Sequence, residues 1–122
     1  MKKKFKILIV DDCPEILLIM EKGFKFHGHQ VNTATSGDEA IEILLNKGFD
    51  VIISDYQMPN GNGMELLSFV TTMNKPPIFY FLSGQADSSV EDCLKAGAKH
   101  FFPKPFELNN LISEVIKKST NH

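Results

Sequence analysis

Residues 5–14 read FKILIVDDCP, and this stretch decides the class of fold. The apolar run Phe5–Val10 is compact enough for one buried strand. It ends at the acidic pair Asp11-Asp12, and Pro14 follows at a position that suits the first turn of a helix. The stretch therefore predicts a strand that passes through two carboxylates directly into a helix.

The same order, a short apolar run and then an amphipathic stretch, recurs along the whole chain. The predicted strands are Phe5–Val10, Val31–Ala34, Asp50–Ser54, Ile78–Leu82 and His100–Phe102. The predicted helices run from Pro14 to near Gly28, from Ser36 to Gly48, through Leu66 and Val70, from Ser88 to Gly97, and from Glu107 to Lys117. Ser36 with Glu39, and Ser88 with Glu91, each have the spacing of a capping box.

Five strand–helix repeats predict an α/β fold with a parallel sheet covered on both faces. The strands are almost continuously apolar, as expected for strands buried on both sides. We predict a three-layer α/β/α sandwich of the flavodoxin-like (βα)5 type, with a five-stranded sheet in the order 2-1-3-4-5.

Bulk properties narrow the class of protein further. The 122 residues fit a single domain, 1–122, and 43% of them are hydrophobic, which is usual for a globular protein. The formal net charge is −2 and the chain has no arginine, so direct nucleic-acid binding is not expected. The sequence contains no apolar stretch long enough to span a membrane and no signal peptide, and we expect a cytoplasmic protein. Cys13 and Cys93 lack metal-type spacing and are expected to be reduced and unpaired.

Polar side chains follow four of the five predicted strands. Asp11 and Asp12 follow the first strand and Asp55 the third. Ser83 follows the fourth strand and Lys104 comes shortly after the fifth. The carboxyl ends of parallel strands meet at one edge of the sheet, so we expect three carboxylates, a hydroxyl and an ammonium to share one crevice.

Three carboxylates in one crevice favour a divalent cation. Two like charges about 4 Å apart repel by roughly 4 kcal/mol at an effective dielectric constant of 20. Lys104 neutralises one carboxylate, and the remaining two suit Mg²⁺, with Mn²⁺ as an alternative. An aspartate can also serve as a nucleophile that forms an aspartyl phosphate, and Lys104 would stabilise charge on the transferred group.

These segments together resemble the receiver domain of two-component response regulators, of the kind used in chemotaxis. The resemblance covers essentially the whole chain and rests on ILIVDDCPEI (7–16), NTATSGDEAIEIL (32–44), VIISDYQMPNGNGMELL (51–67), FLSG (81–84) and HFFPKPF (100–106). It implies that Asp55 is the phosphoacceptor, that Asp12 binds the metal directly, and that Asp11 binds it through water. The backbone carbonyl of Gln57 would be a further metal ligand.

The resemblance also assigns roles around the phosphoryl group. Lys104 would pair with it, the Lys104–Pro105 peptide bond would be cis, and the backbone of Gln57 and Gly84 would contact it. Ser83 and Phe101 would form the switch that responds to phosphorylation. Phe101 stands where the family commonly has Tyr, and Asn62 where Asp is frequent. Gln57 and Gln85 occupy positions that tune the lifetime of the phosphorylated state.

The implied partners are a sensor histidine kinase or a histidine phosphotransfer protein. A downstream protein would bind the face formed by the helix after Ser88, the strand 100–102 and the last helix. The chain would be a monomer or a phosphorylation-dependent dimer, and not an enzyme beyond its own phosphorylation and dephosphorylation.

Other functions remain open on the residues alone. A receiver that is never phosphorylated is one alternative. An aspartyl-nucleophile phosphatase is another, although Gln57 stands where its general acid is expected. A flavin carrier of the same fold is disfavoured by the acidic loop Asp11–Pro14. His27 and His29 form an HxH pair, but no third metal ligand accompanies them.

Overall fold

The computed structural model describes residues 3–84 and 90–121, in which strands and helices alternate. The strands are β1 (Lys6–Val10), β2 (Gln30–Ala34), β3 (Val51–Asp55), β4 (Ile78–Ser83) and β5 (His100–Pro103). The helices are α1 (Pro14–Phe26), α2 (Gly37–Asn46), α3 (Gly63–Val70), α4 (Val90–Lys95) and α5 (Leu108–Thr120). All predicted strands are found, with ends that shift by no more than a residue.

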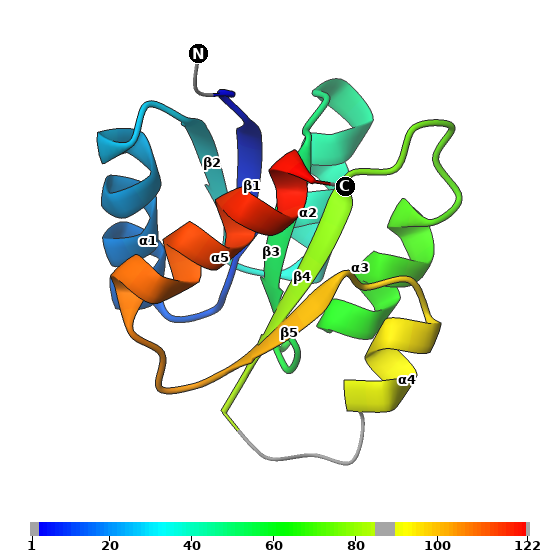
Figure 1. Ribbon diagram of the computed structural model, residues 1–122. Helices are drawn as coiled ribbons and strands as arrows, with labels where there is room; N and C mark the ends of the chain where they lie inside the picture. The colour runs from blue at the N-terminus through cyan, green and yellow to red at the C-terminus, as the bar shows by residue number, and fades with distance from the viewer. Residues whose placement is uncertain (1–2, 85–89, 122) are drawn as a thin grey trace.

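The strands form one parallel sheet in the order β2-β1-β3-β4-β5. Figure 1 shows α1 and α5 together on one face of this sheet, with α2, α3 and α4 on the other. The predicted α/β/α sandwich with flavodoxin-like strand order is therefore confirmed.

The two sides of the sheet bury separate cores. On one side, Ile7, Ile9 and Ile53 pack against Leu17, Met20 and Phe24 of α1 and Val115 of α5. On the other side, Leu8, Val10 and Ile52 pack against Ala40 of α2 and Leu66 and Leu67 of α3. Because neighbouring residues of a strand point to opposite faces, a strand buried on both sides must be apolar throughout. This requirement explains the unbroken apolar run from Ile7 to Val10.

Helix ends differ from the prediction in specific ways. The Ser36 side chain accepts a hydrogen bond from the Glu39 N–H (3.1 Å), but the Glu39 carboxylate accepts from Thr35 N–H instead of Ser36 N–H. The capping box predicted there is therefore only half formed. Ser88, predicted to cap the fourth helix, and Gln85 lie outside the described residues. The last helix continues to Thr120, three residues past the predicted end at Lys117.

A complete capping box occurs at a helix for which none was predicted. The Asn62 side chain accepts from Glu65 N–H (2.9 Å), and the Glu65 carboxylate accepts from Asn62 N–H (3.4 Å). The spacing Asn-x-x-Glu before an apolar stretch was a readable signal for this cap. It fixes the start of α3, directly after the loop that leaves β3.

In the described part of the chain, every helix is too short or too polar to span a membrane.

Candidate functional site

The site is built where β1 and β3 end side by side. Val10, the last residue of β1, pairs with Ser54, so Asp11 lies next to Asp55 at the end of β3. In the next pair of strands, Asp55 is in register with Leu82 of β4, and Ser83 ends that strand. The strand order thus brings together the residues predicted from strand ends.

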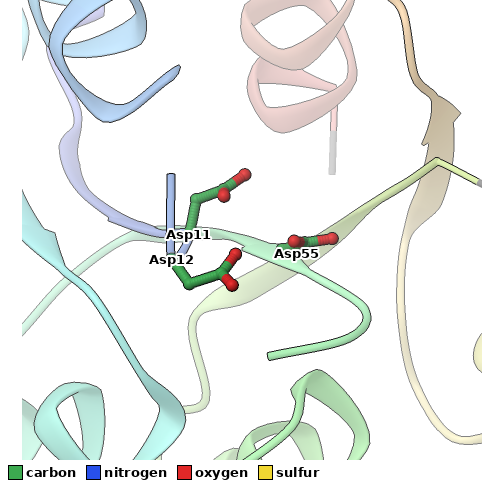
Figure 2. Close-up of side chains that lie close together, drawn as sticks. All are labelled: Asp11, Asp12 and Asp55. Carbon is green, nitrogen blue, oxygen red and sulfur yellow. The ribbon is translucent and has the colours of Figure 1, made fainter. Parts of the chain in front are cut away.

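Three carboxylates converge at this edge. Asp11, Asp12 and Asp55 each offer one oxygen atom, and these atoms all lie within 4.8 Å of one another. Figure 2 shows Asp11 and Asp12 leaving the end of β1 beside Asp55, with their carboxylates gathered between the two strand ends. Asp11 is fully buried and Asp55 nearly so, whereas Asp12 is exposed. The carboxylates therefore repel one another in a partly dehydrated environment.

Lys104 supplies the compensating positive charge. Its Nζ donates to Asp11 Oδ2 at 2.9 Å and forms an ion pair with Asp55 Oδ2 at 3.3 Å. The side chain of Lys104 is only 18% exposed, so water screens these contacts weakly. The Lys104 N–H donates to Ser83 O at 2.6 Å, and the Lys104–Pro105 peptide bond is cis.

The titration behaviour of the site reflects this crowding. Burial and the neighbouring charge of Asp11 raise the pKa of Asp55, and the opposing effect of Lys104 does not cancel the rise. Burial alone would lower the pKa of Lys104, but the hydrogen bond and charge of Asp11, together with Asp55, raise it overall. The ammonium thus stays charged, while the phosphoacceptor candidate carries an electrostatic penalty for its own charge.

Asp11 is held in place by a contact that was not predicted. Its Oδ1 accepts a hydrogen bond from the Cys13 N–H at 2.9 Å. An aspartate that binds the N–H two residues later forms an Asx turn, and such turns are frequent where a strand enters a loop. Both oxygens of Asp11 are thereby engaged, one by Cys13 and one by Lys104. Asp12 keeps its carboxylate in solvent.

The loop between β3 and α3 is fixed by close backbone packing. Gly63 N–H donates to Tyr56 O at 3.0 Å, and a Cβ at Gly63 would lie 2.5 Å from the backbone oxygen of Asp55. The far side of the loop is tied to α2, because Gly37 N–H donates to Gly61 O at 3.0 Å. Only glycine fits at Gly63 without displacing the backbone of the phosphoacceptor candidate.

A small cavity of about 310 Å³ opens beside the carboxylates, lined by Asp55, Gln57, Ser83, Gly84 and Lys104. Within the described residues, the backbone N–H groups of Gln57 and Gly84 donate to no protein acceptor. They are therefore available to an anion in the cavity.

Phe101, predicted to form the switch with Ser83, does not line this cavity. It pairs with Phe81 across β4 and β5, and it packs half-buried against the core under α2, α3 and α4. Its neighbour Phe102 belongs to the core on the other side of the sheet.

The donor set fits a hard divalent cation. Carboxylate oxygens are the ligands that Mg²⁺ and Mn²⁺ prefer, and an exposed Asp12 leaves room for coordinated water. Lys104 balances part of the negative charge, so a divalent ion would come close to neutralising the remainder. His27 and His29 play no part here, because they lie in the turn between α1 and β2, at the opposite end of the sheet.

The fold and this site together define a flavodoxin-like α/β protein with an acidic, lysine-balanced pocket at the carboxyl ends of its strands. Residues 7–116 match the family model of the response regulator receiver domain, and the chain belongs to that family.

Among relatives, the chain is 34% identical over 113 residues to the transcriptional regulatory protein PrrA of Mycobacterium tuberculosis. The match covers 90% of this chain and 48% of PrrA. The response regulator SaeR of Staphylococcus aureus is 31% identical over 119 residues, with 91% of this chain and 52% of SaeR covered. The chain thus spans about half the length of these relatives.

Solved structures with a similar fold are receiver domains or response regulators as well. The receiver domain of the Francisella response regulator 1452 has a TM-score of 0.88 at 27% identity, with 96% of this chain and 98% of that chain covered. The chemotaxis response regulator CheY4 of Vibrio cholerae also has a TM-score of 0.88 at 27% identity, with 95% and 99% covered.

Proposed function

We propose that the protein accepts a phosphoryl group on Asp55 from the phosphohistidine of a sensor histidine kinase or a histidine phosphotransfer protein. The observation that carries this proposal is the gathering of Asp11, Asp12 and Asp55 within 4.8 Å, with Lys104 at 3.3 Å from Asp55. Membership of the receiver family supports it. A merely structural ion pair would not need three carboxylates around one ammonium.

The proposed step is one phosphoryl transfer. An Asp55 carboxylate oxygen forms a bond to phosphorus while the bond from phosphorus to the donor's imidazole nitrogen breaks, and the imidazole keeps that electron pair. Charge accumulates on the phosphoryl oxygens, and Lys104 lies close enough to stabilise it. Gln57, Ser83 and Gly84 line the cavity, and the backbone N–H groups of Gln57 and Gly84 and the hydroxyl of Ser83 would donate to the same oxygens.

Mg²⁺, or Mn²⁺ in its place, would neutralise charge on the transferred group. Asp12 and Asp55 would bind it directly, Asp11 through water, and the backbone carbonyl of Gln57 would complete the protein ligands. Asp11 suits the indirect role because its two oxygens already accept from Cys13 N–H and Lys104.

Phosphorylation would act as a switch. It replaces a charge of about −1 on Asp55 with one of roughly −2 and adds strong acceptor oxygens. Ser83 and Lys104 would move toward the new group, and Phe101 would turn further inward from its half-buried position. The surface formed by α4, β5 and α5 would then present a changed face to a downstream protein, or to a second copy.

The chain would act stoichiometrically, without turnover of other substrates, in the cytoplasm and without contacting nucleic acid itself. Gln57 in place of an acidic residue supports this, because it offers no proton to a leaving group.

Incubation with acetyl phosphate and Mg²⁺, followed by intact-mass spectrometry, tests the proposal. The wild-type protein should gain one phosphoryl group. Asp55→Asn should gain none, because an amide is not a nucleophile of this kind. Asp50→Asn is the matched control, since Asp50 directly precedes β3 at the end opposite Asp55, where its carboxylate accepts from Lys6 N–H.

Two results would contradict the proposal. One is an unmodified wild-type protein under conditions that phosphorylate a known receiver. The other is an equal mass gain in Asp55→Asn. Continuous release of phosphate from phosphate esters would instead indicate a phosphatase.

A further inference from the structure

A second cavity lies at the end of the sheet opposite the aspartates. It has a volume of about 720 Å³, and its lining comes from three separate parts of the chain. These are Lys3 and Lys4 before β1, His27 and His29 in the turn after α1, and the α5 residues Asn109, Ile112, Ser113, Ile116, Lys117 and Thr120. Figure 1 shows the start of β1, the α1–β2 turn and the C-terminal half of α5 at the same end of the molecule. The five residues of β1 separate this cavity from Asp11 by about 17 Å.

The cavity is apolar inside and positive at its rim. Ile112 and Ile116 provide its apolar wall, and the stems of the lysines add methylene groups. Lys3, Lys4 and Lys117 bring three ammonium groups, and none of the described residues that line the cavity carries a carboxylate. Within residues 3–84 and 90–121, none of these three lysines forms an ion pair with Asp or Glu. Uncompensated charges of one sign around a concave surface create a potential that attracts anions.

His29 adds a buried hydrogen-bond donor. It is 7% exposed, and its Nδ1 accepts from the Phe5 N–H at 3.0 Å. The proton of the neutral ring is therefore on Nε2, and no group in the described part of the chain accepts from it. Burial, His27 and Lys4 lower the pKa of His29, in that order, which agrees with a positive local potential.

We propose that this cavity binds a small organic anion with an apolar body, such as an aromatic or aliphatic carboxylate or sulfonate. Its volume lies within the roughly 300–1,000 Å³ of small-molecule sites, which also combine apolar walls with a few polar groups. The apolar body packs on Ile112 and Ile116, and the anionic group lies near Lys4 and Lys117. Phosphorylation at the other end of the strands is not needed for this binding.

The test uses a pair of fluorescent probes that differ in one group. Anilinonaphthalene sulfonate (ANS) carries a sulfonate, and N-phenyl-1-naphthylamine is its neutral counterpart. Wild-type protein should bind ANS saturably, one per chain, and more tightly than the neutral probe. Lys117→Glu should weaken ANS binding about tenfold, since it reverses one charge at the rim, and should leave the neutral probe unaffected.

Two further variants complete the design. Ser113→Phe should reduce the binding of both probes, because Ser113 is exposed on α5 and a phenyl ring there occupies the cavity. Lys95→Glu makes the same charge change on α4, across the sheet, and should change nothing. All three variants should still be phosphorylated by acetyl phosphate, which keeps this test independent of the function proposed for Asp55.

NMR chemical shifts identify where ANS binds. ANS should shift the methyl signals of Ile112 and Ile116 and the ring signals of His29. Shifts confined to Ile16 and Ile19 would place the probe in the apolar hollow beside Lys104 and overturn the proposal. Equal affinity for both probes, or ANS binding unchanged in Lys117→Glu, would also overturn it. So would a dimer in solution that Ser113→Phe dissociates, because a second copy would then cover the cavity.

Discussion

The two ends of the sheet carry opposite charge arrangements. At the carboxyl ends, three carboxylates lie together, and Lys104 forms part-buried ion pairs with two of them at 2.9 and 3.3 Å. At the amino ends, three lysines and two histidines surround a cavity whose lining, among the residues that the structure describes, includes no Asp or Glu. The first arrangement is crowded and only partly compensated by Lys104, whereas the lysines of the second form no ion pair among the described residues. A lysine therefore has a different energetic role at each end: Lys104 compensates buried carboxylates, whereas Lys117 forms no ion pair among the described residues.

The largest expected effect comes from removing one cation at each end. Lys104→Met should destabilise the protein by about 3 kcal/mol in metal-free buffer, because the buried Asp11 loses its ion pair. Lys117→Met should change stability by less than about 0.5 kcal/mol, because Lys117 is exposed and compensates no carboxylate. Urea unfolding in EDTA measures both. Similar losses in the two variants would mean that the ends do not differ as described.

The next largest effect on stability is the electrostatic penalty for the charged carboxylate of Asp55. Its pKa is raised, so the native state keeps this proton to higher pH than the unfolded chain and loses stability as pH rises through the raised pKa. Asp55→Asn should therefore be more stable than wild type at pH 7 in EDTA, by about 1 kcal/mol. The advantage should vanish below pH 3.8, the ordinary pKa of aspartate, and also in saturating Mg²⁺.

Thermal unfolding of wild type and Asp55→Asn across pH, with and without Mg²⁺, checks this prediction. An Asp55→Asn variant that is less stable than wild type in EDTA would show that Asp55 is not under electrostatic strain.

The smallest change in stability is expected at the amino end of the sheet, at His29. Its pH dependence is opposite to that of Asp55, because stability is lost as the pH falls. Burial lowers the pKa of His29, so the native state resists protonation, and stability falls as pH drops through 6.5 and then through the lowered pKa. His29→Asn keeps an acceptor for Phe5 N–H and removes the titrating group. It should reduce the stability lost between pH 7 and pH 5 by less than about 1 kcal/mol, measured by urea unfolding. An unchanged pH dependence would contradict a suppressed His29 protonation.

The convergence of Asp11, Asp12, Asp55 and Lys104 could be predicted from the sequence because each lies at or just after the end of a strand. Once the strand order is known, Asp11, Asp55 and Ser83 must meet, since parallel strands end at one edge. The Asn62–Glu65 cap and the Asx turn at Asp11 were readable from local spacing and were missed. The half-formed capping box at Ser36 shows that spacing alone does not predict the partner of the glutamate. The Glu39 carboxylate accepts a hydrogen bond from the Thr35 N–H and not from the Ser36 N–H.

The amino-end cavity was beyond the reach of sequence patterns. Its lysines precede a strand, its histidines lie in a turn, and its apolar wall belongs to a helix some eighty residues further along. No periodicity connects such residues, since only the packing of α5 beside α1 brings them together.

The most direct test of the account is a calorimetric Mg²⁺ titration of the wild-type protein and Asp12→Ala. Convergence of the carboxylates on a cation predicts one Mg²⁺ per wild-type chain and affinity at least about tenfold weaker in Asp12→Ala. Lys117→Glu serves as the control at the other end of the sheet and should bind Mg²⁺ as the wild type does. Absence of Mg²⁺ uptake by the wild type, or equal affinity in Asp12→Ala, would contradict the account.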